Sequence, residues 1–200
     1  MLKKVRGLTL IELLVSMVLM SLVVLGLSSI DTFSRHHVIS SDKRVKVQNE
    51  ISYALEYMSK YVQQSIGDIN NPPIKRYPAT GTQTGFQVRI VSGTPTDLSD
   101  YTSGDYTWVA FSLSGNEITC GSESLTKKIS GSFVADTLMP ENPPADEGFY
   151  VKITGGPSAD QGMAVDVGLV GRYDPAVAAS LNNPQISMKT HLVSFNSPAQ

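Results

Sequence analysis

The chain has 200 residues, a formal net charge of -2 and 41% hydrophobic residues. Its length fits one ordinary domain plus an appendage, and its apolar content is that of a protein that folds. The charge gives no electrostatic basis for nucleic-acid binding, because a phosphate-binding surface needs a local excess of lysine and arginine. The single cysteine, Cys120, excludes an intramolecular disulfide, and we expect a free buried thiol rather than a reactive or intermolecular one.

A basic leader precedes an apolar segment at the N-terminus. Lys3, Lys4 and Arg6 are followed by Gly7 and by an apolar run from Leu8 to Ile30. Because excess positive charge stays on the cytoplasmic side of a bilayer, we expect the N-terminus inside and everything after about residue 30 outside. A helix over the run is roughly 35 Å long, enough to cross a bilayer, and the run is longer than the apolar core of a secretory signal peptide.

Glu12 lies near the start of this apolar run. A carboxylate inside a membrane span costs on the order of 2.5 to 3.5 kcal/mol, so a plain anchor gains nothing from it. We therefore expect Glu12 to have a function and a positively charged partner at the same depth. A newly exposed α-amino group would supply that charge.

Residues 3–14 have the sequence KKVRGLTLIELL. This segment resembles the processing motif of type IV prepilins and type II secretion pseudopilins. The resemblance implies that a prepilin peptidase cleaves after Gly7 and methylates the new terminal amine of Leu8. It also implies that Glu12, at the fifth mature position, pairs with the N-terminal amine of a neighbouring subunit and so sets the register of assembly.

The segment differs from the family pattern in two details. Leu8 stands where the family more often has Phe or Met. The span also lacks the proline that major pilins commonly have in its second half, and Gly26 is the weak point of the helix there. The missing proline favours a minor pilin or a pseudopilin.

Apolar residues recur at helical spacing from residue 31 to residue 66, where no glycine or proline interrupts the chain. They are Val47, Ile51, Ala54, Leu55, Met58, Val62 and Ile66. This spacing predicts an amphipathic helix whose apolar stripe packs against a sheet. Joined to the span, it predicts one helix from Leu8 to Ile66, ended by Gly67 and the following prolines.

Beyond the helix the apolar pattern changes to short runs rich in β-branched and aromatic residues. The predicted strands are Gly85–Val91, Tyr106–Leu113, Glu117–Cys120, Phe149–Thr154, Met163–Val170 and Ile186–Phe195. Residues 114–116, Ser-Gly-Asn, predict a hairpin turn. Residues 134–138 remain ambiguous, and residues 175–181 are compatible with a short helical turn.

These elements predict an α+β, pilin-like fold, in which a long N-terminal helix with a transmembrane first half packs on an antiparallel β-sheet head. The expected segments are a leader (1–7), a transmembrane and filament-core helix (8–30), its amphipathic continuation (31–66) and a strand-rich head (67–200). The order of elements is similar to that of minor pilins of the type II secretion J and type IV pilus W kind.

No motif predicts a metal, a cofactor or a catalytic centre. His36 and His37 point about 100° apart on a helix and cannot share a metal. The spacing of Asp97, Asp100 and Asp105 is not that of a calcium loop. The glycines 155–156 lack the Lys-Ser/Thr pair of a phosphate cradle, and a Cys120–His191 pairing has no supporting signature. We expect no enzymatic activity.

The sequence thus predicts a structural subunit of a type IV pilus or type II secretion pseudopilus. Its expected partners are other pilin or pseudopilin subunits, the prepilin peptidase, an inner-membrane assembly platform and, before assembly, the lipid bilayer. Nucleic acid is not among them, although a DNA-uptake or adhesive pilin with a basic or aromatic patch stays open. The alternative is a single-span, membrane-anchored extracytoplasmic domain that binds a ligand.

Overall fold

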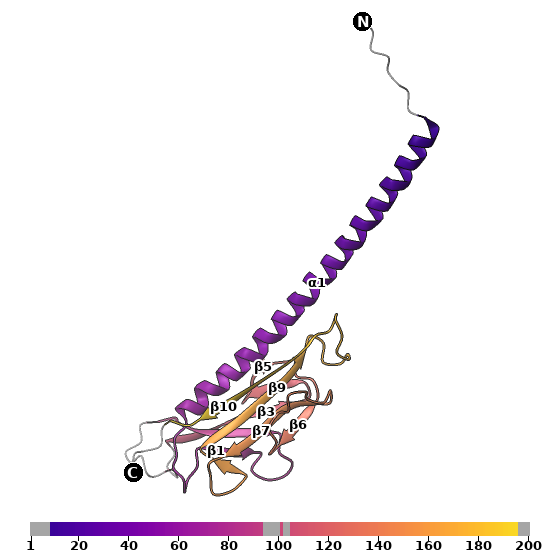
Figure 1. Ribbon diagram of the computed structural model, residues 1–200. Helices are drawn as coiled ribbons and strands as arrows, with labels where there is room; N and C mark the ends of the chain where they lie inside the picture. Colours follow the sequence, from indigo (N-terminus) through magenta and orange to yellow (C-terminus); the bar gives the residue numbers. More distant parts are fainter. Residues whose placement is uncertain (1–8, 94–100, 102–104, 196–200) are drawn as a thin grey trace. The chain divides into compact units, whose positions relative to one another are not determined.

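The computed structural model describes residues 9–93, 101 and 105–195 (Figure 1). The chain divides into two units, Met1–Ser41 and Asp42–Gln200. Helix α1 runs from Leu10 to Gln64 and contributes to both units. The predicted α+β class is confirmed: one long helix and a set of β-strands make up the described chain.

Helix α1 ends at Gln64, slightly earlier than the predicted end at Ile66. The backbone N–H of Ile66 donates to the carbonyl of Arg89 at 2.9 Å, so the chain has already joined a strand by this residue. Asp68 then accepts the N–H groups of Asn70 and Asn71, both at 2.7 Å. A tertiary contact therefore ends the helix before Gly67 is reached.

The described residues contain ten strands. They are β1 (Ile74–Tyr77), β2 (Gly85–Val91), β3 (Tyr106–Ser114), β4 (Glu117–Cys120), β5 (Glu123–Thr126), β6 (Ser132–Ala135), β7 (Glu147–Thr154), β8 (Gln161–Gly162), β9 (Ala164–Arg172) and β10 (Gln185–Val193). Each of the six predicted strands is present, with ends shifted by at most a few residues. Strands β1, β5, β6 and β8 were not predicted.

The strands form two sheets, whereas the sequence predicted one. The first has six strands in the order β5-β4-β3-β2-β1-β8, and all neighbouring pairs are antiparallel. Strands β3 and β4 are joined at the predicted hairpin turn, where Gly115 has a φ of 61° that favours glycine. The second sheet has the order β10-β9-β7-β6, and its β6–β7 pair is parallel.

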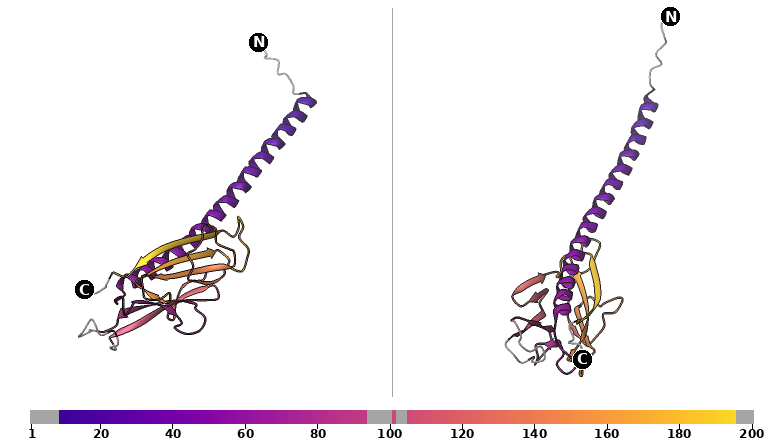
Figure 2. Two further views of the ribbon diagram at one scale, coloured as in Figure 1. Left: turned by 60° about the horizontal axis from the view of Figure 1, so that its bottom comes forward. Right: turned by 90° about the vertical axis from the view of Figure 1, so that its left-hand side faces the viewer.

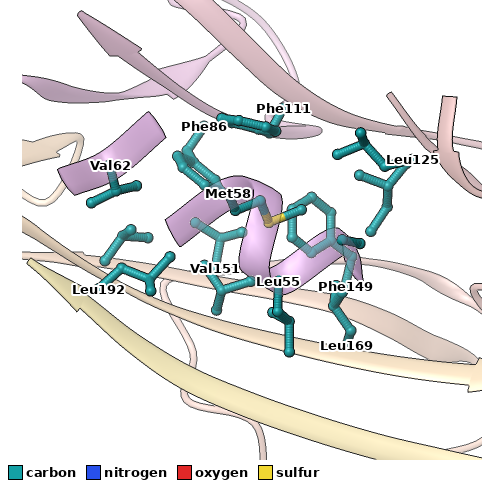
Figure 3. Packing of buried hydrophobic residues seen from close by; sticks show 14 of the residues in the cluster. Leu55, Met58, Val62, Phe86, Phe111, Leu125, Phe149, Val151, Leu169 and Leu192 are labelled. Carbon is teal, nitrogen blue, oxygen red and sulfur yellow. The ribbon is translucent and has the colours of Figure 1, made fainter. Parts of the chain in front are cut away.

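The part of α1 that belongs to the second unit lies between the two sheets (Figure 2). Figure 3 shows Leu55 and Met58 of the helix between Phe86 and Phe111 of the six-stranded sheet and residues of the four-stranded sheet. The rings of Phe86 and Phe111 stack with centroids 5.2 Å apart. The second sheet contributes Phe149, Val151, Leu169 and Leu192 to this core.

The predicted apolar stripe of the helix is confirmed, because six of its seven members are buried in α1. Gly171 of β9 makes the close approach of the helix possible: a Cβ there would lie 2.6 Å from Cδ1 of Ile51. The helix thus covers the inner faces of both sheets.

Residues 175–181 form no helix, although the N–H of Val177 donates to the carbonyl of Asp174 at 3.2 Å and closes a single turn. The buried side chain of Asn183 donates from Nδ2 to the carbonyls of Asp174 (2.9 Å), Val177 (2.8 Å) and Ala178 (3.2 Å). An amide side chain that reaches several carbonyls replaces the hydrogen bonds that a helix would supply. This connection between β9 and β10 is therefore an ordered loop.

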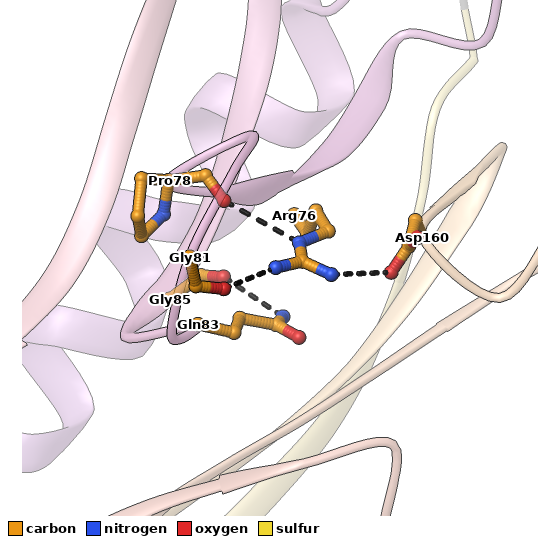
Figure 4. A network of polar contacts seen from close by, with 6 residues as sticks. All are labelled: Arg76, Pro78, Gly81, Gln83, Gly85 and Asp160. Carbon is orange, nitrogen blue, oxygen red and sulfur yellow. Dashed lines mark hydrogen bonds and ion pairs between the residues drawn. The ribbon is translucent and has the colours of Figure 1, made fainter.

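A second polar network fixes the turn between β1 and β2 (Figure 4). The guanidinium of Arg76 donates to the carbonyls of Gly81 (2.5 Å) and Pro78 (3.4 Å) and pairs with Asp160 at 3.3 Å. Its backbone N–H also donates to the carbonyl of Asp160 at 2.8 Å. Arg76 thereby ties this turn to the segment before β8.

Candidate functional site

The start of α1 is capped by its own side chains. The carboxylate of Glu12 accepts hydrogen bonds from the backbone N–H and the hydroxyl of Thr9, both at 2.9 Å. The backbone N–H of Glu12 lies 3.4 Å from the hydroxyl oxygen of Thr9, so the two residues form a reciprocal capping box. Glu12 is therefore held at the end of the helix, where the helix dipole favours a negative charge.

Glu12 is the one charged residue between Leu10 and Ile30. The serine hydroxyls of this segment bond to their own helix: Ser16 donates to the carbonyl of Glu12 at 2.7 Å, and Ser21 donates to that of Met17 at 2.8 Å. These bonds satisfy the hydroxyl donors without an external partner. The Glu12 carboxylate, in contrast, would be stabilised by a positive charge from outside the helix.

The apolar side chains of this segment are exposed all round the helix. Fifteen large hydrophobic residues between Leu10 and Ile30 are each at least half exposed. Among the described residues, α1 is the one helix long and apolar enough to cross a membrane, and its apolar stretch is not buried. So wide an uncovered apolar surface needs lipid or other helices around it.

Two of the three predicted site residues, Gly7 and Leu8, lie outside the described residues. Glu12 is described, and the structure adds Thr9, which was not among the predicted site residues. The signal for Thr9 was present, because Thr-x-x-Glu before an apolar run is the sequence pattern of a capping box.

Comparison with known proteins agrees with this N-terminal site. The family described as the prokaryotic N-terminal methylation motif matches residues 2–28. This match supports the type IV pilin and pseudopilin family that residues 3–14 predicted, and it supports anchoring in a membrane. It does not distinguish a W or J kind. A search of curated proteins and a search of solved structures each gave no match.

The head contains a shallow cavity of about 310 Å³ on the outer side of the four-stranded sheet. Asp166, Lys189 and His191 line it together with Leu138 and Met139. Nδ1 of His191 lies 2.8 Å from Oδ1 of Asp166. Asp166 can orient the imidazole of His191, but the described residues that line the cavity include no serine or cysteine nucleophile.

The other candidate groups are not brought together. Cys120 lies on β4 and His191 on β10, in different sheets. The ring of His37 packs against Phe33, with centroids 4.5 Å apart. Asp97 and Asp100 lie outside the described residues. Within the described part of the chain, no three histidine, cysteine or acidic side chains gather as metal ligands would.

A cluster of cations and aromatic rings lies on the outer face of the six-stranded sheet. The guanidinium of Arg89 lies 4.8 Å from the ring centroids of both Trp108 and Tyr101, and Nζ of Lys75 lies 5.2 Å from that of Trp108. Burial first, and then the charge of Arg89, lower the pKa of Lys75. Arg89 is only 4% exposed, so its charge holds the two rings together instead of facing a ligand. Arg89 therefore adds no exposed positive charge to this face.

Cys120 is buried, as predicted, and is expected to be unreactive in the folded protein. Burial, with a smaller contribution from the charge of Glu123, raises the pKa of its thiol, so the nucleophilic thiolate is disfavoured. Iodoacetamide should modify Cys120 slowly at neutral pH in the native protein and completely in urea, as measured by intact mass. Rapid native modification would show that the thiol is accessible.

Proposed function

We propose that the chain is a structural subunit of a type IV pilus or type II secretion pseudopilus, assembled after its leader is removed. The observation that carries this proposal is an uncovered apolar helix with a single carboxylate, held at its capped start and preceded by a basic leader. A helix with apolar side chains on every side packs among like helices once it leaves the membrane. Other pilin subunits and the prepilin peptidase are the partners that the methylation motif implies.

The processing step that we propose is cleavage between Gly7 and Leu8, followed by methylation of the Leu8 amine. Cleavage there places the new α-amino group directly before Thr9 and its capping box. The basic residues of the leader stay in the cytoplasm, so the helix crosses the inner membrane once and the head lies outside the cytoplasm. The lipid bilayer then surrounds the helix until an inner-membrane assembly platform transfers the subunit to the filament.

In the assembled state we propose that Glu12 pairs with the amine of a neighbouring subunit. A carboxylate has about four acceptor positions, and the two contacts to Thr9 leave room for a charged donor. Pairing removes an uncompensated charge from an apolar environment for both partners. Contacts of this head-to-tail kind do not close on themselves, so they build a helical filament.

Within the filament we propose the role of a minor subunit. The span has no proline in its second half, where the helix of a major pilin melts during assembly. A subunit whose span stays helical suits a rare position, such as the tip or the initiating complex.

The experiment that tests the proposal is intact-mass spectrometry of the protein extracted from membranes of its own cells. We expect the mass of residues 8–200 plus one methyl group. The same preparation from cells without prepilin peptidase should retain the mass of the uncut chain.

An uncut chain in cells that process other prepilins would contradict the proposal. The alternative would then stand: a membrane-anchored extracytoplasmic domain whose ligand binds the head. That outcome would also leave Glu12 without the amine that the proposed pairing needs.

A further inference from the structure

Strand β10 is the open edge of the four-stranded sheet. It pairs with β9 along its whole length of 9 residues, from Gln185 to Val193. No described strand lies on its other side. No proline interrupts this strand, and its register with β9 is continuous, so two of the features that protect edge strands are missing here; a third, a charged side chain, is present as Lys189.

The hydrogen-bond pattern shows which backbone groups point outward. The N–H of Ser194 donates to the carbonyl of Met163, at the end of the β9–β10 ladder. In an antiparallel pair, residues alternate between bonding to the partner and pointing away from it. The even-numbered residues of β10 therefore bond to β9, and the N–H and C=O groups of Ser187, Lys189 and His191 point to the open edge.

A second bond confirms this alternation from the other side of β9. The N–H of Ser130 donates to the carbonyl of Val170, away from β10. Even-numbered residues of β9 thus point away from β10, and odd-numbered ones, such as Leu169 opposite Met188, bond to it. The hydrogen bonds on the two sides of β9 therefore agree that the backbone groups of Ser187, Lys189 and His191 point to the open edge.

The inner side of the edge is incompletely covered. Ile186 and Met188 face the core but are only partly buried, whereas Val167 and Leu169 on the neighbouring strand are fully buried. A further strand beside β10 would cover the apolar side chains that the present edge leaves partly open. Its inward positions would have to be apolar.

The outer side of the edge carries one lysine. Lys189 is exposed, and no carboxylate in the described part of the chain forms an ion pair with it. Asp166 is already paired with His191. A second copy of β10 added in antiparallel register about Lys189 would place two lysines opposite each other, which is unfavourable. The charge favours a different strand with acidic residues on this side.

We propose that β10 is a docking strand for an extended segment of another protein, which adds to the sheet as an antiparallel strand with alternating apolar and acidic residues. The backbone of the segment bonds to the open groups of Ser187, Lys189 and His191. Its acidic side chains lie beside Lys189, and its apolar side chains cover Ile186 and Met188. This mode of recognition takes affinity from the backbone and specificity from alternate side chains. It does not depend on the filament role.

The test uses the full chain in detergent and a fluorescent, end-blocked peptide as long as β10, in which Val and Glu alternate. Fluorescence anisotropy should show binding about tenfold tighter than that of the matched Val/Lys peptide. In the antiparallel arrangement, the residue opposite Lys189 directs its own N–H toward β10. N-methylation of the Glu residues should therefore abolish binding, and N-methylation of the Val residues should leave it nearly unchanged.

Two variants of the chain complete the test. Lys189→Glu should reverse the preference between the Glu and Lys peptides. Ser187→Pro removes an outward N–H without breaking the β9 ladder and should weaken binding, whereas Ser187→Ala should not. Equal binding of both peptides, an equal effect of the two methylation patterns, or an unchanged preference in Lys189→Glu would overturn the proposal.

Discussion

Replacing Glu12 with alanine is expected to abolish incorporation into filaments while leaving leader cleavage and membrane insertion intact. The change removes the single charge of the apolar segment, so a neighbour's amine would enter an apolar environment unpaired. Removing one partner of a buried ion pair costs about 3 to 5 kcal/mol, because the other charge is left uncompensated. This free energy corresponds to more than a hundredfold loss of affinity between subunits. Immunoblots of sheared filaments and of membranes, together with intact mass, measure assembly and processing separately.

Two further variants separate the ion pair from the helix cap. Glu12→Gln keeps a side-chain acceptor for Thr9 and loses the charge, and Thr9→Val loses the hydroxyl and keeps the charge. A cap contributes about 1 kcal/mol, much less than an unpaired buried charge. We therefore expect Glu12→Gln to fail in assembly as Glu12→Ala does, and Thr9→Val to assemble at a modestly reduced level.

Normal assembly of Glu12→Gln would contradict the proposed pairing. The cap would then be the function of Glu12, and Thr9→Val should show the larger defect. Failure of leader cleavage in any of these variants would show that the segment is needed for recognition by the peptidase, and assembly would have to be measured after cleavage by other means.

The long helix and the uncovered apolar segment at its start could be predicted from the sequence. Charge, apolar length and one carboxylate are local properties, and each of them has a direct physical meaning at a membrane. The one residue missed there, Thr9, acts through a local pattern that was also present in the sequence. Its role became clear only from the two hydrogen bonds that it donates to Glu12.

The head was less predictable because its strand pairing depends on contacts between residues distant in sequence. Strand β2 was predicted with its observed ends, since it has a strong run of β-branched and aromatic residues. Strands β1 and β5 have 4 residues each, with charged side chains, and pair because a neighbouring strand is present. The division into two sheets and the parallel β6–β7 pair are set by contacts between residues distant in sequence and leave no local signal.

Replacing Phe149 with alanine is expected to destabilise the head by about 3 to 5 kcal/mol. The ring of Phe149 is fully buried, lies in the core around Met58 (Figure 3), and meets the ring of Phe133 at a centroid distance of 5.3 Å. Its removal leaves a cavity between the helix and the four-stranded sheet, because neither element can move without breaking its other contacts. Since the free energy of unfolding of a domain is about 5 to 15 kcal/mol, this loss removes a large part of the stability of the head.

Phe195→Ala is the matched control, because it makes the same chemical change at a ring that is 72% exposed. Urea unfolding of both variants in detergent can be followed by the fluorescence of Trp108, the single tryptophan of the chain. We expect a large shift of the midpoint for Phe149→Ala and almost none for Phe195→Ala. Similar midpoints for the two variants would mean that the helix and the four-stranded sheet do not share a tightly packed core, and that the head is held together by strand pairing instead.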